Sequence, residues 1–214
     1  MKPQLPLGSI YLLTDPNLSS GRTHEEVVRE SIAGGAKIIQ LRDKIATTRK
    51  LIEIGKKLRE MTLKAGVIFI VNDRVDIALS VDADGVHLGE DDMPIAYARK
   101  ILGEGKIIGI SVDNVEKAKI AEAEGADYIA LGPIFSTKTK INAGEPVGVE
   151  EIKKVKSIVR LPVIAIGGIN LQNIQLVAMA GADSVAVISA VVGAPDIRRA
   201  MKELVEKMGK YYNP

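Results

Sequence analysis

The chain contains 214 residues, of which 46% are hydrophobic and 26% are charged, and its formal net charge is +2. It has no cysteine, which excludes disulfides, thiolate catalysis and cysteine metal sites. The near-neutral charge and an aromatic content of 3% argue against nucleic-acid binding, which needs a basic surface and usually stacking rings.

The apolar runs predict no membrane span, since stretches such as residues 161–166 are far shorter than the roughly 20 residues that a span requires. Pro3 and Pro6 interrupt the apolar stretch that a signal peptide would need. We therefore expect a cytoplasmic protein that binds small molecules rather than a membrane, and the sequence leaves open whether it forms a homo-oligomer.

Short β-branched runs alternate with amphipathic helical stretches along the chain, which is typical of βα units around a parallel sheet. Each of the eight predicted strands is followed by a predicted helix. Thr23 and Glu26 form a capping-box pattern, which predicts the start of the first helix. In chain order the strands are predicted at residues 10–14, 38–42, 68–72, 85–88, 107–112, 128–131, 163–166 and 184–189.

A short repeat supports this count, because glycine-containing triplets at 35–37, 83–85, 125–127 and 181–183 each end a helix and lead into a strand. We expect these glycines to supply the left-handed residue that stops a helix. Eight units in 214 residues average about 27 residues each, which predicts a compact (β/α)8 TIM barrel with a single domain over residues 1–214. A doubly wound sheet is less favoured, because neither a G-x-G-x-x-G after the first strand nor a P-loop motif occurs.

In such a barrel the active site lies at the carboxyl ends of the strands, so polar residues there are candidates for function. Nearly every predicted strand ends in polar residues, and they are more than the caps of the following helices would require. They are Thr14, Asp15, Gln40, Arg42, Lys44, Asn72, Asp73, His87, Ser111, residues 136–140, Gly167, Gly168 and Ser189.

The segment after the second strand combines an amide with two cations. Strand alternation sends Gln40 and Arg42 to one face, and Lys44 follows in the loop, so the three can hold a polar ring and a polyanion. An internal salt bridge between Arg42 and a neighbouring aspartate is the alternative.

Two carboxylates follow adjacent strands. Asp73 and Asp92 could share one Mg²⁺, which prefers one or two carboxylates together with substrate phosphates and water. Either could instead be a helix N-cap, Asp92 in particular because Pro94 follows it.

The later strands lead into loops suited to anions. The polar connector from Ser136 to about Pro146 is predicted to be a lid or a binding loop, with a solvated turn as the alternative. Gly167-Gly168 and Ile188-Ser189 follow the last two strands, where these barrels commonly bind phosphate on backbone N–H groups, although a packing glycine pair would look the same. His87 is either a polar filler of the barrel or a participant.

Taken together and in this order, these residues resemble the thiamine-phosphate synthase family over essentially the whole chain. The family's pyrimidine-diphosphate motif is similar to Gln40, Leu41, Arg42, Asp43 and Lys44 with Asn72. Its magnesium aspartates are similar to Asp73 and Asp92, and its strand-end serine is similar to Ser111. Its thiazole-phosphate loop resembles Thr137, Lys138, Thr139 and Lys140, and its phosphate-binding backbone resembles Gly168, Ile188 and Ser189. Leu41 and Asp43 depart from the phenylalanine and glutamate that the family often has there.

The resemblance implies that hydroxymethylpyrimidine diphosphate is joined to a thiazole phosphate, carboxylated or not, releasing diphosphate and giving thiamine phosphate. It implies Mg²⁺ as cofactor and catalytic roles for Lys44, Ser111 and Lys140, which would meet the charge of the departing diphosphate. A related thiazole tautomerase and a non-catalytic protein that binds thiamine precursors are the two alternatives.

Overall fold

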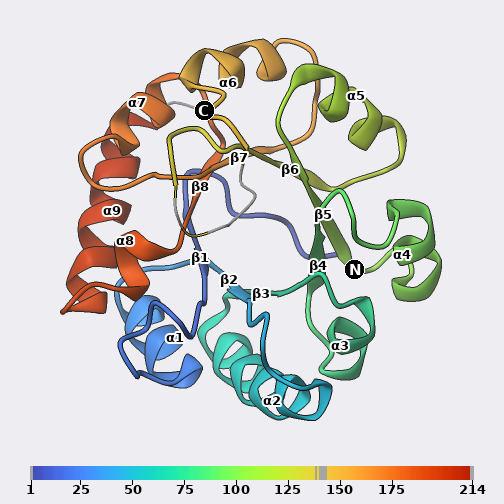
Figure 1. Cartoon of the computed structure of the whole chain (residues 1–214), viewed down its shortest axis with the longest axis vertical. Coiled ribbons are helices and arrows are strands. Elements are labelled where there is room, and N and C mark those ends of the chain that lie inside the picture. Colours follow the sequence, from blue (N-terminus) through green and yellow to red (C-terminus); the bar gives the residue numbers. More distant parts are fainter. Residues whose placement is uncertain (1, 138, 140–143, 213–214) are drawn as a thin grey trace.

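The eight strands close into one parallel barrel in which each strand pairs with its neighbours in the sequence, and β8 pairs with β1 (Figure 1). The computed structural model describes residues 2–137, 139 and 144–212. The predicted TIM barrel is confirmed. The strands are β1 Ile10–Leu13, β2 Ile38–Leu41, β3 Ile68–Asn72, β4 Gly85–Leu88, β5 Ile107–Val112, β6 Tyr128–Leu131, β7 Val163–Ile166 and β8 Ser184–Val187.

Strands β3 to β7 have the predicted bounds, whereas β1 and β2 end one residue earlier and β8 ends two residues earlier. The extension of the last strand to Ser189 is wrong because Ser189 begins a short helix of its own. The prediction of one helix after each strand is also wrong at this point, since β8 is followed by two.

The helices pack around the outside of the barrel (Figure 1). Thr23 forms the predicted capping box, in which its side chain accepts the N–H of Glu26 and its own N–H donates to Glu26 Oε2 at 2.7 Å. In the part of the chain that the structure describes, the helices are α1 His24–Ala33, α2 Thr48–Ala65, α3 Val75–Ser80, α4 Ile95–Leu102, α5 Val115–Ala123, α6 Val149–Lys156, α7 Ile174–Met179, α8 Ser189–Val192 and α9 Ile197–Tyr211. No helix among these residues is both long and apolar enough to cross a membrane.

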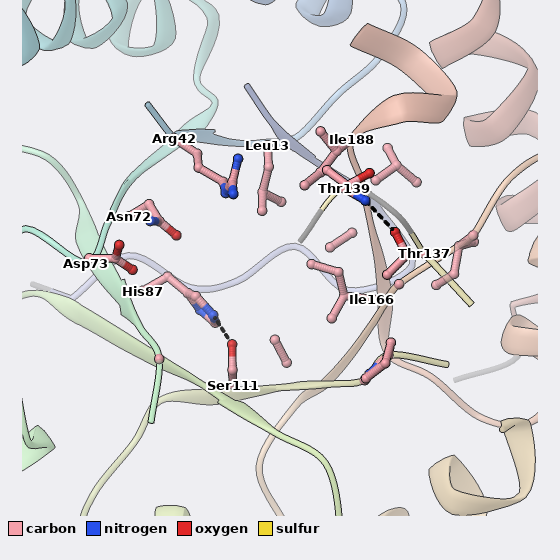
Figure 2. Close-up of a pocket in the computed structure, with 18 of the residues that line it drawn as sticks. Leu13, Arg42, Asn72, Asp73, His87, Ser111, Thr137, Thr139, Ile166 and Ile188 are labelled. Atoms are coloured by element: carbon pink, nitrogen blue, oxygen red, sulfur yellow. Dashed lines mark hydrogen bonds between the residues drawn. The ribbon is translucent and has the colours of Figure 1, made fainter. Parts of the chain in front are cut away.

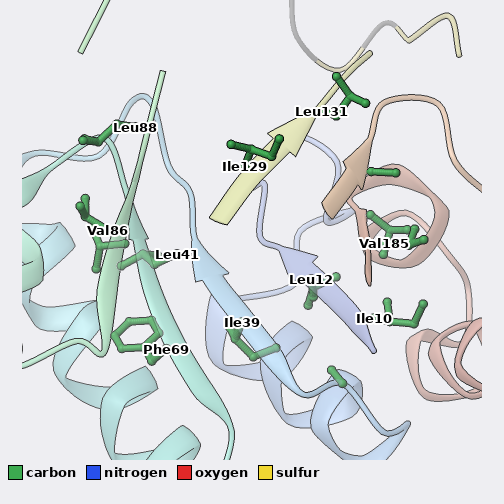
Figure 3. Close-up of a cluster of buried hydrophobic side chains, with 14 of the residues drawn as sticks. Ile10, Leu12, Ile39, Leu41, Phe69, Val86, Leu88, Ile129, Leu131 and Val185 are labelled. Atoms are coloured by element: carbon green, nitrogen blue, oxygen red, sulfur yellow. The ribbon is translucent and has the colours of Figure 1, made fainter. Parts of the chain in front are cut away.

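Two hydrophobic cores lie on opposite faces of the strands because successive side chains alternate in direction. The outer core fills the space between strands and helices and includes Leu12, Ile39, Leu41 and Phe69 (Figure 3). The inner core fills the barrel with the alternate residues, which are Tyr11, Leu13, Ile38, Ile68, Ile70, Ile107, Tyr128, Ile164 and Ala186. Inward-facing residues nearer the carboxyl ends are therefore left to line a pocket.

The amino ends of the strands carry a repeated ion pair. Asp84, Asp127 and Asp183 each precede an even-numbered strand and accept the backbone N–H of a residue in the preceding strand, at 2.7–2.8 Å. Each also pairs with a cation on the helix that leads into that preceding strand, at 2.7–3.0 Å. The cations are Arg59, Arg99 and Lys156.

The glycine repeat is confirmed at three of its four places. Gly35, Gly125 and Gly181 have φ of 103°, 85° and 93° and so take the left-handed conformation that ends a helix. The second copy is different, because Gly85 lies inside β4 and Asp82, at φ 53°, is the left-handed residue. The side chain of Asp tolerates this conformation better than most, so a glycine is not required there.

Candidate active site

A cavity of about 420 Å³ opens at the carboxyl ends of the strands, and residues in all eight strands or at their ends line it. In the view of Figure 2, Arg42, Asn72 and Asp73 lie on one side, whereas Thr137 and Thr139 lie on the other. Among the described residues, eleven of those that the family resemblance assigns to the site line it, namely Arg42, Lys44, Asn72, Asp73, Asp92, Ser111, Thr137, Thr139, Gly168, Ile188 and Ser189. The strand-end candidates His87 and Gly167 line it as well.

The two cations on one side are paired with carboxylates. Arg42 Nη1 contacts Asp15 Oδ2, so the salt bridge that the sequence allowed as an alternative is present, although Arg42 also lines the cavity. Lys44 Nζ contacts Asp73 Oδ2, and the Lys44 side chain is 55% exposed. Lys44 can therefore leave Asp73 and bind an incoming anion instead, and because its ammonium group is near the surface this change costs little desolvation.

Asp73 and Asp92 lie close enough to influence each other. Burial raises the pKa of Asp92, and the neighbouring carboxylate of Asp73 raises it further, while the hydrogen bond from the Gly89 N–H and the charge of Lys44 act in the opposite direction. Asp92 Oδ2 accepts the N–H of Gly89 at 2.7 Å, which holds its carboxylate at the cavity. Asp73 has a φ of 60°, an uncommon conformation for a residue other than glycine and one that clusters at functional sites.

Neither aspartate caps a helix. Helix α3 has Arg74 at its N-cap and α4 has Pro94, and neither helix has a side-chain cap hydrogen bond. The N-cap alternative is therefore wrong for both residues. Within the described residues no group of three or more His, Cys, Asp or Glu side chains could hold a metal ion. Two carboxylates fit Mg²⁺ only if substrate or water supplies its remaining oxygen ligands, which is the coordination that Mg²⁺ favours.

Among the residues that the structure describes, the opposite side of the cavity is built from uncharged groups, and we call it the uncharged side. Gly168 has a φ of 65°, and a Cβ at this position would lie 2.5 Å from the carbonyl oxygen of Ser136. Asn170 and Asn173 donate to the Gly168 carbonyl at 3.3 and 3.0 Å and so fix the turn after β7. The N–H of Thr139 donates to Thr137 Oγ1 at 3.3 Å.

Some predicted residues lie outside the cavity. Gln40 is buried inside the barrel, Leu41 points outward into the outer core, and Asp43 accepts the N–H groups of Ile45 and Ala46 at 3.0 and 2.9 Å. Burial acts to raise the pKa of Asp43, yet these N–H groups and His24, 3.1 Å away, hold it below the ordinary value. Lys138, Lys140 and part of the predicted lid lie outside the described residues.

Sequence reasoning did not identify a chain of buried hydrogen bonds beneath the cavity. Gln40 Nε2 donates to the Tyr11 hydroxyl at 2.6 Å, and the hydroxyls of Tyr11 and Tyr128 are 3.0 Å apart. Nδ1 of His87 is 2.9 Å from the Tyr128 hydroxyl, and its Nε2 is 3.0 Å from Ser111 Oγ. Inward-facing tyrosines at two strand positions were the available signal, but a pattern of alternation does not show that they meet.

A family model described as thiamine monophosphate synthase matches residues 10–191. The chain belongs to this family. It is 49% identical over 195 residues to the thiamine-phosphate synthase of Chloroflexus aurantiacus. This aligned stretch covers 91% of this chain and 90% of that one. The solved structure of the thiamine phosphate pyrophosphorylase from Pyrococcus furiosus matches with a TM-score of 0.89 and 45% identity, over 96% of this chain and 97% of that one. As a member of this family the chain is a transferase.

The fold is more widely shared than the family. A solved 3-hexulose-6-phosphate synthase matches with a TM-score of 0.69 at 19% identity, over 92% of this chain and 99% of that one. At that identity the likeness concerns the barrel alone. The chemistry of this chain is therefore set by the side chains at its cavity and not by the barrel.

Proposed function

We propose that the cavity binds hydroxymethylpyrimidine diphosphate and a thiazole phosphate, carboxylated or not, and joins them into thiamine phosphate. The observation that carries the proposal is the approach of two carboxylates, Asp73 and Asp92, beside Lys44 at one side of the cavity. Such a set suits a diphosphate that arrives with a divalent cation.

The reaction exchanges one bond for another. The bond between the pyrimidine methylene carbon and the diphosphate oxygen breaks, and diphosphate leaves with the electron pair. The lone pair of the thiazole nitrogen then forms the new carbon–nitrogen bond, so no general base is needed for the attack. Where the thiazole carries a carboxylate, the bond between that group and the ring carbon breaks, carbon dioxide leaves, and the ring carbon keeps the electron pair and takes up a proton from water.

The chain's own residues would stabilise charge in this displacement. Arg42 and Lys44, which line the cavity, would bind the diphosphate, and the hydroxyl of Ser111, which lines it too, would donate to a departing oxygen. Mg²⁺, held by Asp73 and Asp92, would supply further positive charge at those oxygens. Lys138 and Lys140 are included in the proposal on their sequence positions alone.

The uncharged side of the cavity would bind the thiazole phosphate. Its backbone after β7 and β8, at Gly168, Ile188 and Ser189, occupies the place where barrels of this type commonly bind phosphate. Thr137 and Thr139 add hydroxyl groups on the same side. The two substrates would thus meet across the cavity, with Ser111 between the two sides.

Turnover by the purified protein tests the proposal. With both substrates and Mg²⁺ we expect thiamine phosphate and diphosphate in equal amounts, and excess chelator should reduce the rate at least a hundredfold. Unchanged rates in chelator would contradict the metal role. Binding of both substrates without product would favour a precursor-binding protein, and proton exchange on the thiazole alone would favour a tautomerase, which has no use for Asp73, Asp92 and Lys44.

A further inference from the structure

The interior of the barrel contains one continuous chain of hydrogen bonds from Gln40 to Ser111. Its members come from β1, β2, β4, β5 and β6, so it crosses most of the barrel and is not a feature of one strand. Tyr11, Tyr128 and Gln40 are at most 1% exposed, and His87 is 7% exposed. Only its last member, Ser111, together with the edge of His87, reaches the cavity (Figure 2).

The orientation of the Gln40 amide gives this chain a direction, because its nitrogen faces the Tyr11 hydroxyl, whereas its oxygen has no hydrogen-bond partner among the described residues. The amide nitrogen of Gln40 can only donate, so the Tyr11 oxygen accepts from it and the single hydrogen of Tyr11 is left for Tyr128. The hydrogen of Tyr128 then goes to Nδ1 of His87. A neutral imidazole carries its one hydrogen on the other nitrogen in that case, so Nε2–H donates to Ser111 Oγ.

Both phenols keep their hydrogens throughout. Burial raises the pKa of Tyr128 well above its ordinary value, and burial likewise raises that of Tyr11. The two rings also contact each other edge to face with centroids 6.2 Å apart, and the His87 ring stacks on Tyr128 at 5.6 Å. The packing therefore holds these hydroxyls in place as well as the hydrogen bonds do.

We infer that Tyr11, Tyr128 and His87 are positioning residues that fix His87 as the Nε2–H tautomer and thereby turn the Ser111 hydroxyl hydrogen into the cavity as a donor. Because the Ser111 oxygen already accepts from His87, its hydrogen is directed to an acceptor elsewhere. The inference rests on the proposed function, since the departing diphosphate is the acceptor. With the opposite direction, Ser111 would donate to His87 and present only lone pairs to an anion.

Nitrogen-15 NMR of protein labelled at histidine tests the tautomer without any turnover. His24 gives the second signal, and a His87→Gln variant assigns the first by its loss. We expect the Nε2–H form in the wild type and a mixture of both tautomers in Tyr128→Phe. Tyr11→Phe should loosen the tautomer in the same way, because it removes the donor that commits the Tyr128 hydrogen to His87. Tyr97→Phe is the control, since Tyr97 is an exposed tyrosine in α4 and its loss should leave the tautomer unchanged. A dominant Nδ1–H form, or an unchanged spectrum in Tyr128→Phe, would overturn the inference.

Kinetics test the consequence for Ser111. Tyr128→Phe should lower kcat roughly tenfold with little change in KM, because orientation of a donor matters most in the transition state. In a Ser111→Ala background the same change should have no further effect. A purely structural role would instead give additive losses in both backgrounds, which would refute the positioning role.

Substitutions of His87 give a second route should Tyr128→Phe not fold. The amide nitrogen of glutamine can reach the place of Nε2 and donate to Ser111, whereas that of asparagine is one bond too short. His87→Gln should therefore retain kcat at least about tenfold better than His87→Asn, and equal losses would count against the inference. If the wild type forms no thiamine phosphate, the proposed function fails, and the NMR result still decides the tautomer.

Discussion

The two ends of the barrel hold their aspartates in different ways. At the amino end, Asp84, Asp127 and Asp183 each bind a strand N–H and a cation on a packed helix. At the carboxyl end, Asp73 adopts a left-handed backbone conformation, and its carboxylate pairs with the half-exposed side chain of Lys44. The negative charge of Asp73 repels that of Asp92. The amino-end aspartates are held by backbone N–H groups, whereas the pair of Asp73 with Lys44 can break so that each side chain binds another partner.

This contrast indicates how the fold separates stability from chemistry. A carboxylate bound to a strand N–H and a helix cation ties two elements together, and at this end of the barrel it lies away from the cavity. Two carboxylates that face each other cost stability, and a divalent cation with its substrate can relieve that cost. The division matches the general separation in such barrels between a stabilising amino-terminal face and an active carboxyl-terminal face.

The largest effect is expected at the carboxyl end. Asp73→Asn should lower kcat with Mg²⁺ about a hundredfold, about 3 kcal/mol in the barrier, because the proposed metal site would lose one charged ligand. Its melting temperature should stay equal to that of the wild type or rise. Asp91→Asn is the control, since Asp91 is an exposed carboxylate on the same cavity wall. A loss of melting temperature that parallels the loss of rate would mean that Asp73 holds the fold.

The opposite result is expected at the amino end. Asp183→Ala should lower the free energy of unfolding by about 3 kcal/mol, because the buried N–H of Val163 and the charge of Lys156 lose their partner. Denaturant titration measures this, and kcat of the folded fraction should not change. Glu60→Ala removes an exposed helix ion pair with Lys64 and should leave unfolding unaffected. A lower kcat in folded Asp183→Ala would break the proposed separation.

Only the carboxyl-end part of this contrast could be predicted from sequence. Alternation of β-branched runs with amphipathic helical stretches predicts eight strands, and parallel order places Asp73 and Asp92 at neighbouring strand ends. Alternation gives the face of a residue but not its depth along the barrel axis, which depends on the register of all eight strands. Gln40 pairs with Leu13, which lines the cavity, and with Ile70, which belongs to the inner core, so its burial beneath the cavity could not be predicted from β2 alone. Leu41 lies on the outward face that alternation assigns, although the family motif placed it at the site.

The uncharged side of the cavity offers a smaller test. Gly168→Ala should weaken binding of the thiazole phosphate about tenfold and leave binding of the pyrimidine diphosphate unchanged, because the new Cβ would displace Ser136 and the turn after β7. Calorimetry with each substrate separately measures this. Gly66→Ala is a matched control, since Gly66 has a φ of 64° with no atom near its missing Cβ. Equal weakening of both substrates would contradict the division of the cavity.

The smallest effect concerns the repulsion at the carboxyl end. Asp92→Asn should raise the melting temperature at pH 7 by about 2–4 °C, equivalent to about 1 kcal/mol for a chain of this length. The pKa of Asp92 is raised in the folded protein, first by burial and then by Asp73. The folded state therefore keeps the proton longer than the unfolded state, and wild-type stability falls as pH rises through that range. An asparagine does not ionise, so the advantage of the variant should be absent near pH 4 and complete at neutral pH.

Calorimetric melting of both proteins from pH 4 to 8 measures this difference, with Asp91→Asn as the exposed control on the same wall. Addition of Mg²⁺ should then stabilise the wild type more than Asp92→Asn, because only the wild type offers two carboxylates to the cation. The gain from the substitution should therefore shrink, or reverse, as Mg²⁺ is raised. If Asp92→Asn melts below the wild type at pH 7 without Mg²⁺, the hydrogen bond from Gly89 N–H outweighs the repulsion, and the contrast between the two ends would not extend to Asp92.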